Sequence, residues 1–331
     1  MRHVFRWDLD KTYLRTDFDS LRGLVKAAFE PAREKRAFPG AATLLREIRA
    51  HGPVGLFLLS GSPTQMRGVL EEKLRLDGVV ADGLVLKPNL ENLLRLRFRA
   101  IRDQIGFKIV ELFAARARLD RDLPETLVGD DAESDAFTYS LYADVLAARI
   151  GPSDLDRILD AAGVDARNRQ NAADLAESVE KSDAVRRILI HLERGSGPAR
   201  FARFGPRLVC FRNYFQAAAV LHADGHLEAD AVARVAAEMI VGHAFAEDHL
   251  LEAARELARS GSVPTPALAE VASGMAAVAS GDPPPPAADT LQALADRIRH
   301  LAAAPSPPRP LQRDVDYLAA IAAREHRGAG G

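Results

Sequence analysis

Two aspartates, two positions apart, follow a short apolar run at the start of the chain. Residues 3–7 favour a strand, and Asp8 and Asp10 come directly after it, where extended chain turns into a loop. One such carboxylate could attack a phosphorus centre and form an aspartyl-phosphate, while the other exchanges protons with the leaving group. The structural alternative is that paired aspartates after a strand form a turn or cap a helix.

A hydroxyl and a lysine follow further along the chain. Ser60 ends the apolar run 56–59 and precedes a predicted helix, so its hydroxyl and the nearby amides could hold phosphate oxygens, or Ser60 could simply cap that helix. Lys108 lies among apolar neighbours, at the predicted start of a helix, and could neutralise a phosphate and a nucleophile. The alternatives are a lysine that only packs its stem on apolar surface, and Lys87 as the functional cation.

An acidic segment at residues 129–135 follows a third predicted strand. Asp130, Asp131 and Asp135 would repel one another and the first aspartate pair unless a divalent cation lay between them. Mg²⁺ prefers oxygen ligands and often binds one or two carboxylates together with substrate phosphate. The alternative is an acidic surface turn. Taken together, the four segments contain a nucleophile, an acid/base, a phosphate anchor, a cation and metal ligands, which suffices for phosphoryl transfer.

The elements that must position these groups alternate between strands and helices. Strands are predicted at 3–7, 54–59, 126–128 and 143–146, and amphipathic helices at 18–30, from about 39 to 52, and after Pro63. This alternation predicts an α/β fold with a parallel sheet covered on both faces. In such a sheet the carboxyl ends of the strands lie at one edge, where ligands bind.

Beyond Gly151 the sequence shows helical periods and almost no strand signals. We therefore expect two domains, an α/β domain at residues 1–150 and an all-α helical domain of unknown role at 151–331. A helix is predicted to begin at Ser153, and further helices are predicted at 168–194, 207–222, 229–242, 246–260, 266–279, 290–304 and 312–326, with Gly- and Pro-rich breaks.

Composition limits the classes of function and location. The 331 residues have a net charge of −2, so the chain as a whole does not attract nucleic acid or an acidic membrane. The lone Cys210 excludes an internal disulfide framework and is expected to be a small buried hydrophobe. The first residues lack a signal peptide's apolar stretch, and no run approaches the ~18 apolar residues of a membrane span. The expected location is the cytoplasm.

The four segments resemble the ordered motifs of the haloacid-dehalogenase (HAD) phosphohydrolases. The resemblance rests on residues 8–12, Ser60, Lys108 and residues 129–135, and it covers roughly residues 3–147. Within that superfamily the chain is most similar to the catalytic domain of the actin-patch phosphatidate phosphatases. That likeness rests on residues 59–63, 84–87 and 107–109, and on Tyr139 and Tyr142.

The resemblance implies a HAD-like Rossmannoid parallel sheet with helices on both faces and little or no cap. It implies that Asp8 is the nucleophile, that Asp10 is the general acid/base, and that Thr12 braces the first loop. The residues that it assigns to the phosphoryl group or its surroundings are Thr12, Ser60, Gly61 and Lys108.

The implied cofactor is Mg²⁺. Its implied ligands are Asp8, the backbone carbonyl of Asp10, and Asp130. Asp135 would either bind the ion directly or contact one of its ligands, and the role of Asp131 stays open. Three residues depart from the subfamily pattern and bear on the substrate rather than on the chemistry: Lys11, Phe107 and Asp131.

The expected activity is Mg²⁺-dependent hydrolysis of a phosphomonoester, whose substrate is a phosphorylated small molecule or a lipid head group such as that of phosphatidate. The alternative function is that of an adaptor or regulatory protein whose helical half binds a protein partner. A third possibility is that the helical half provides a dimer interface or a lid over the site. Arginines that could face an anionic substrate, or simply solvent, are Arg200, Arg203, Arg207 and Arg212. The histidines with no metal-ligand spacing are His222, His226, His243 and His249.

Overall fold

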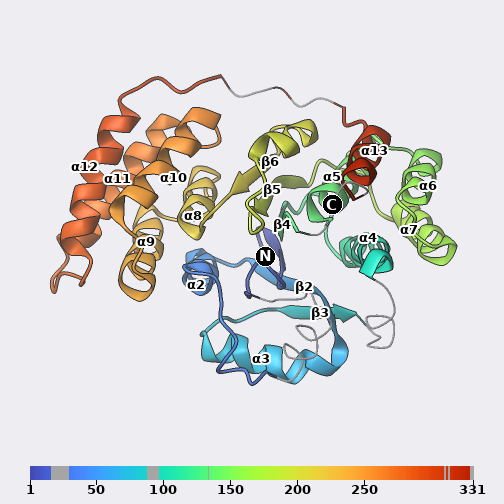
Figure 1. Cartoon of the computed structure of the whole chain (residues 1–331), viewed down its shortest axis with the longest axis horizontal. Coiled ribbons are helices and arrows are strands. Elements are labelled where there is room, and N and C mark those ends of the chain that lie inside the picture. The colour runs from blue at the N-terminus through green and yellow to red at the C-terminus, as the bar shows by residue number, and fades with distance from the viewer. Residues whose placement is uncertain (16–29, 88–96, 133, 309–310, 312–313, 329–331) are drawn as a thin grey trace.

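A six-stranded parallel sheet forms the centre of the molecule in a computed structural model, which describes residues 1–15, 30–87, 97–132, 134–308, 311 and 314–328 (Figure 1). Its strand order is β3-β2-β1-β4-β5-β6, and each neighbouring pair is parallel. The prediction of an α/β fold with a parallel sheet is confirmed. The strands are β1 (Val4–Asp8), β2 (Gly55–Pro63), β3 (Gly83–Lys87), β4 (Glu125–Asp130), β5 (Val185–His191) and β6 (Leu208–Phe211).

Helices cover both faces of the sheet because consecutive strand residues point to opposite sides. In β4, Val128 joins one hydrophobic core and Leu127 joins the other, and Leu189 and Ile190 of β5 divide in the same way. The first core contains α2 (Ala41–His51), α3 (Arg67–Leu76) and α8 (Tyr214–Ala223). The second contains α4 (Arg97–Arg116), α5 (Asp135–Leu146), α6 (Pro152–Ala161), α7 (Ala166–Ser178) and α13 (Tyr317–Gly328).

A helical layer extends the first core away from the sheet. It comprises α9 (Ala229–His243), α10 (Glu247–Ser260), α11 (Thr265–Ala279) and α12 (Ala288–Ala302), which lie side by side at one end of the molecule (Figure 1). These four helices match the predicted ones within two residues at each end. The chain then returns to the opposite side, where α13 packs on α5 and α6. No described helix is long and apolar enough to cross a membrane.

The prediction of purely helical structure after residue 151 is wrong. Residues 185–191 and 208–211 form β5 and β6, and β5 pairs directly with β4, so the sheet continues past residue 150. The predicted helix at 168–194 contains α7 and then a strand. The strand was not evident because its apolar run Ile188–Ile190 is preceded by two arginines. The guanidinium of Arg187 is buried there because Asp224 neutralises it, with Nε 2.6 Å from Oδ2.

Three local expectations also differ from the structure. Residues 143–146 are not a strand but the last turn of α5, all of whose residues are buried, so this helix has no polar face to show a helical period. Lys108 lies in the second half of α4 rather than at its start. The predicted helix at 18–30 lies outside the described residues, except for Glu30. The expectation of little or no cap concerns the segments between the four motifs, and parts of these segments, residues 16–29 and 88–96, also lie outside the described residues.

Candidate active site

The point where the chain reverses its direction of winding lies between β1 and β4. From β1, the chain adds β2 and β3 on one side and then crosses over to add β4, β5 and β6 on the other. The connections therefore diverge beside the carboxyl ends of β1 and β4, which leaves room there for a ligand. Asp8 is the last residue of β1 and Asp130 is the last residue of β4. The fold thus brings these two carboxylates together at the position where ligands bind in such sheets.

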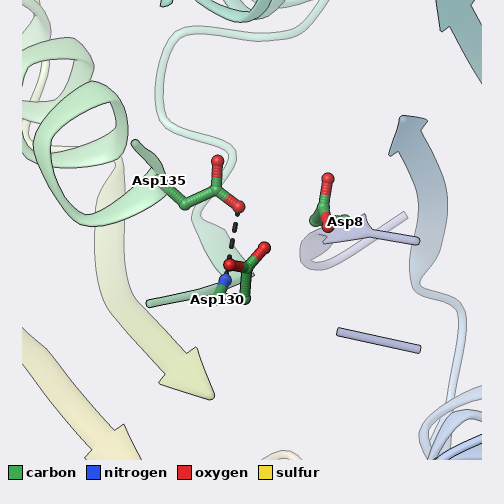
Figure 2. Close-up of side chains that lie close together, drawn as sticks. All are labelled: Asp8, Asp130 and Asp135. Atoms are coloured by element: carbon green, nitrogen blue, oxygen red, sulfur yellow. Dashed lines mark hydrogen bonds between the residues drawn. The ribbon is translucent and has the colours of Figure 1, made fainter. Parts of the chain in front are cut away.

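Three predicted metal ligands form one cluster at this point. Asp8, Asp130 and Asp135 each place a carboxylate oxygen within 4.8 Å of the others, and all three are fully buried (Figure 2). Oxygens that share an octahedral Mg²⁺ at about 2.1 Å lie roughly 3–4 Å apart. The donor set consists of hard oxygens only, and its spacing is compatible with Mg²⁺. No other group of described residues offers three such ligands.

Lys108 supplies a positive charge to the cluster. Its Nζ lies 2.9 Å from Oδ1 of Asp8 and 2.5 Å from Oδ1 of Asp135, and its side chain is fully buried. A buried ammonium between two carboxylates offsets the repulsion that would otherwise raise the energy of the folded state. Helix α4 therefore carries the predicted lysine to Asp8. The alternative cation, Lys87, is the last residue of β3.

A glycine allows Asp135 to approach the end of β4. A Cβ atom added at Gly129 would lie 2.2 Å from Oδ2 of Asp135, which is a severe overlap. The same Oδ2 accepts a hydrogen bond from the amide of Asp130 at 3.3 Å (Figure 2). Oδ1 of Asp130 accepts one from the amide of Ala132 at 2.5 Å. The backbone at the end of β4 thus orients both carboxylates.

Asp131 has a different role from its neighbour Asp130. Its two carboxylate oxygens accept hydrogen bonds from the amides of Arg194 and Ser196, at 2.9 and 3.1 Å. These amides belong to the loop that follows β5. Asp131 therefore holds that loop, and Asp135 is the additional acid that joins Asp8 and Asp130.

Asp10 is held by two hydroxyl groups. Ser60 and Ser62 donate hydrogen bonds to its Oδ2, at 2.6 and 2.8 Å, and all three residues are buried. The amide of Ser62 also donates to Oγ of Ser60 at 2.9 Å. Ser60 therefore does not cap the following helix, whose flanking residues have no side-chain cap. Sequence reasoning did not single out Ser62 as a residue that contacts Asp10, although Ser62 lies within residues 59–63, on which the family resemblance partly rests.

Thr12 contacts a carboxylate of the site directly, whereas Gly61 affects the site through the packing of β2 against α4. The hydroxyl of Thr12 donates to Oδ2 of Asp8 at 3.1 Å, so Thr12 orients the carboxylate of Asp8. Gly61 lies between the two serines, and a Cβ atom there would lie 3.0 Å from Nε2 of Gln104. Gly61 therefore keeps the strand end close to α4.

Lys35 is a further cation near the site that sequence reasoning missed. It is buried, its Nζ lies 3.7 Å from Oε2 of Glu30, and it interacts electrostatically with Asp10. Burial lowers its pKa, while Glu30 and Asp10 act in the opposite direction. Nothing in the sequence pattern around Lys35 pointed to this, because the loop that carries it has no periodicity.

Three of the four arginines that were candidates for substrate contact have other surroundings: Arg203, Arg207 and Arg212. Arg207 forms ion pairs with Asp144 and Asp183, which removes it from the predicted candidates for substrate contact. Arg203 and Arg212 line a cavity of about 1030 Å³ beside β6, and the aspartate cluster is not part of its lining. Cys210 lines the same cavity, where burial raises the pKa of its thiol to about 12 and so disfavours the reactive thiolate.

The comparisons with known proteins add no family assignment. No protein-family model, no curated protein and no solved structure matches this chain.

Proposed function

We propose that this protein is a Mg²⁺-dependent phosphomonoesterase of the HAD type. The observation that carries the proposal is the meeting of six groups from four separate segments at one edge of the sheet: Asp8, Asp10, Ser60, Lys108, Asp130 and Asp135. The four segments are those that resemble the ordered HAD motifs. The strand order, which places β1 and β4 at the switch point, supports the same proposal.

Asp8 would act as the nucleophile. One of its carboxylate oxygens would attack the phosphorus atom, the bond from phosphorus to the ester oxygen would break, and an aspartyl-phosphate would form. Thr12 and Lys108 hold the two oxygens of Asp8 at 3.1 and 2.9 Å, so the carboxylate enters the reaction already oriented. Lys108 would also stabilise the charge on the phosphoryl oxygens.

Asp10 would transfer protons in both halves of the reaction. Its carboxyl group would donate a proton to the departing ester oxygen. The resulting carboxylate would then accept a proton from the water that attacks the aspartyl-phosphate, which releases phosphate and restores Asp8. The hydroxyl groups of Ser60 and Ser62 fix this carboxyl group through one oxygen, Oδ2.

Asp8, Asp130 and Asp135 would hold the Mg²⁺ ion. When bound, the ion would neutralise charge on the substrate phosphate and lower the repulsion that the phosphate meets from the carboxylates. The adaptor alternative has less support, because a module without catalysis has no need for buried carboxylates and a buried lysine in this arrangement.

The test is phosphate release from a panel of para-nitrophenyl phosphate, sugar phosphates, nucleotides and phosphatidate, with and without Mg²⁺. We expect turnover that requires Mg²⁺ and is abolished in Asp8→Asn, and the preferred substrate would test the narrower phosphatidate phosphatase proposal. Folded protein that releases no phosphate from any substrate, or equal activity in Asp8→Asn, would overturn the proposal. A partner recovered in stoichiometric amount with the full chain would then favour the adaptor.

A further inference from the structure

The loop that follows the nucleophile contacts residues from the second half of the chain. Tyr214, the first residue of α8, donates a hydrogen bond from its hydroxyl to the backbone carbonyl of Thr12, across 202 positions. His191, the last residue of β5, places Nδ1 3.0 Å from the carbonyl oxygen of Lys11. Two consecutive carbonyl groups of the catalytic loop are thus bound by side chains that the sequence analysis had placed in another domain.

The loop has a conformation that needs such support. Lys11 has a φ of 58°, in the left-handed region that non-glycine residues rarely adopt. Within the loop, the amides of Tyr13 and Leu14 donate to the carbonyl of Leu9, at 2.9 and 2.8 Å. These local bonds close the turn. Its orientation relative to the sheet is fixed by contacts from outside the loop: those of Ser60 and Ser62 with Asp10, that of the Phe38 amide with the carbonyl of Tyr13, and those of His191 and Tyr214.

Both donors are themselves rigidly held. The ring of Tyr214 stacks on Trp7, with centroids 6.2 Å apart and an interplanar angle of 17°. It also packs edge-on against Phe211, and His191 stacks on Phe211 at 5.1 Å. Asn213 begins α8 by accepting a hydrogen bond from the amide of Gln216, which fixes the helix start. The donors therefore cannot follow the loop if it moves.

The protonation states of both donors suit this role. Burial raises the pKa of Tyr214, so its hydroxyl keeps its proton throughout the physiological range. Burial also lowers the pKa of His191, so its imidazole is neutral and Nδ1 carries the proton that Lys11 accepts.

We propose that Tyr214, together with His191, is a positioning residue for the catalytic loop, which sets Asp10 and Thr12 in place relative to Asp8. This inference rests on the proposed phosphatase function. The two bound carbonyls are those of Lys11 and Thr12, and Asp10 directly precedes Lys11 in the chain. Since the hydroxyl of Thr12 orients Asp8, the contact from Tyr214 acts on the nucleophile through Thr12. The second half of the chain is thereby a part of the active site.

The experiment compares Tyr214→Phe with Tyr317→Phe in the full chain. Tyr214→Phe removes only the hydroxyl and keeps the ring on Trp7. Tyr317→Phe is the matched control, because its buried hydroxyl donates at 2.6 Å to Oδ2 of Asp144, which lies nine positions along α5 from Asp135 and is not a member of the carboxylate cluster. Three quantities are measured: amide hydrogen exchange in residues 9–15, Mg²⁺ affinity by calorimetry, and kcat and KM for phosphate release.

We expect faster exchange in residues 9–15, Mg²⁺ affinity weaker by about 10-fold, and a comparable fall in kcat with little change in KM, in Tyr214→Phe alone. If both variants lose thermal stability and behave alike in all three measurements, Tyr214 is a structural residue only and the inference is overturned. Wild-type Mg²⁺ affinity and kcat in Tyr214→Phe would overturn it too. Failure of the phosphatase proposal is recognised separately, by an inactive wild type or an active Asp8→Asn, and loop exchange and Mg²⁺ affinity then still decide the role of Tyr214.

Discussion

Nζ of Lys108 lies 2.9 Å from Oδ1 of Asp8, although 100 positions separate the two residues in the chain. Both side chains are completely buried. A charge in such a place depends on its partner, because neither group can be hydrated once the other is removed. The pair therefore couples the stability of the fold to the chemistry of the site.

Lys108→Met should test that coupling. The variant leaves Asp8 and Asp135 buried without their cation, so we expect a loss of about 3–5 kcal/mol in the free energy of unfolding. Urea unfolding followed by circular dichroism measures it. The double variant Lys108→Met/Asp8→Asn should lose less than the sum of the two single variants, since removing one carboxylate reduces the repulsion. Additive losses would show that the two charges do not interact.

Gly129→Ala should disturb Asp135 specifically. The new Cβ atom would overlap Oδ2 of Asp135, so the carboxylate has to move away from the cluster. We expect Mg²⁺ affinity to fall at least about 10-fold, as for other changes that displace a ligand. Gly151→Ala is the matched control, because a Cβ atom there meets nothing within 4 Å. Calorimetric titration with Mg²⁺ makes the comparison, and equal affinity in the two variants would contradict the close approach.

Asp131→Asn and Asp135→Asn should separate the two acids that follow Asp130. Asp135 belongs to the cluster, so its substitution should greatly reduce Mg²⁺ affinity and turnover. Asp131 binds the amides of Arg194 and Ser196, so its substitution should cost about 1–2 kcal/mol of stability and leave Mg²⁺ affinity nearly unchanged. The reverse pattern in a Mg²⁺ titration would make Asp131 the ligand.

His3 should make stability depend on pH. Burial, assisted by His226 and Arg186, lowers the pKa of His3 to about 3, whereas the unfolded chain has a pKa near 6.5. The unfolded state therefore binds more protons between these values, and stability is complete above about pH 6.5 and declines as the pH falls towards 3. Between pH 6.5 and 5 the loss should be about 1–2 kcal/mol.

His3→Gln isolates this contribution, because glutamine can still bond to Thr126 but does not titrate. Urea unfolding at several pH values should give a flatter profile for this variant than for the wild type. The exposed His249 provides the control, and His249→Gln should retain the wild-type slope. A slope that is unchanged in His3→Gln would assign the pH dependence to other groups.

A fragment of residues 1–150 should not fold cooperatively. It would lose β5, the neighbour of β4, and would expose the face of α5 that packs on β5. It would also lose the donors to the carbonyls of Lys11 and Thr12. Thermal unfolding of the fragment should lack a sharp transition. A cooperative transition in the fragment would support the predicted division of the chain into two domains at residue 150.

Local patterns in the sequence were sufficient to predict an α/β fold, most of the helices and the main candidates of the site. Asp8, Ser60 and Asp130 were predicted to meet because the carboxyl ends of parallel strands share one edge of a sheet. The helices α9 to α12 were predicted because their apolar residues recur with the helical period, which is a local property. Each of these inferences needs only neighbouring residues and a general rule of sheet geometry.

Only the tertiary structure decided where the sheet ends and how the site is held. β6 has only four residues, and buried Arg187 belongs in β5 only because Asp224 reaches it from 37 positions away. Asp131 and Asp135 are alike in sequence, and the loop after β5 is what separates their roles. The contact from Tyr214 to Thr12 spans 202 positions. Pairing over such separations depends on the packing of the whole chain, and no local pattern encodes it.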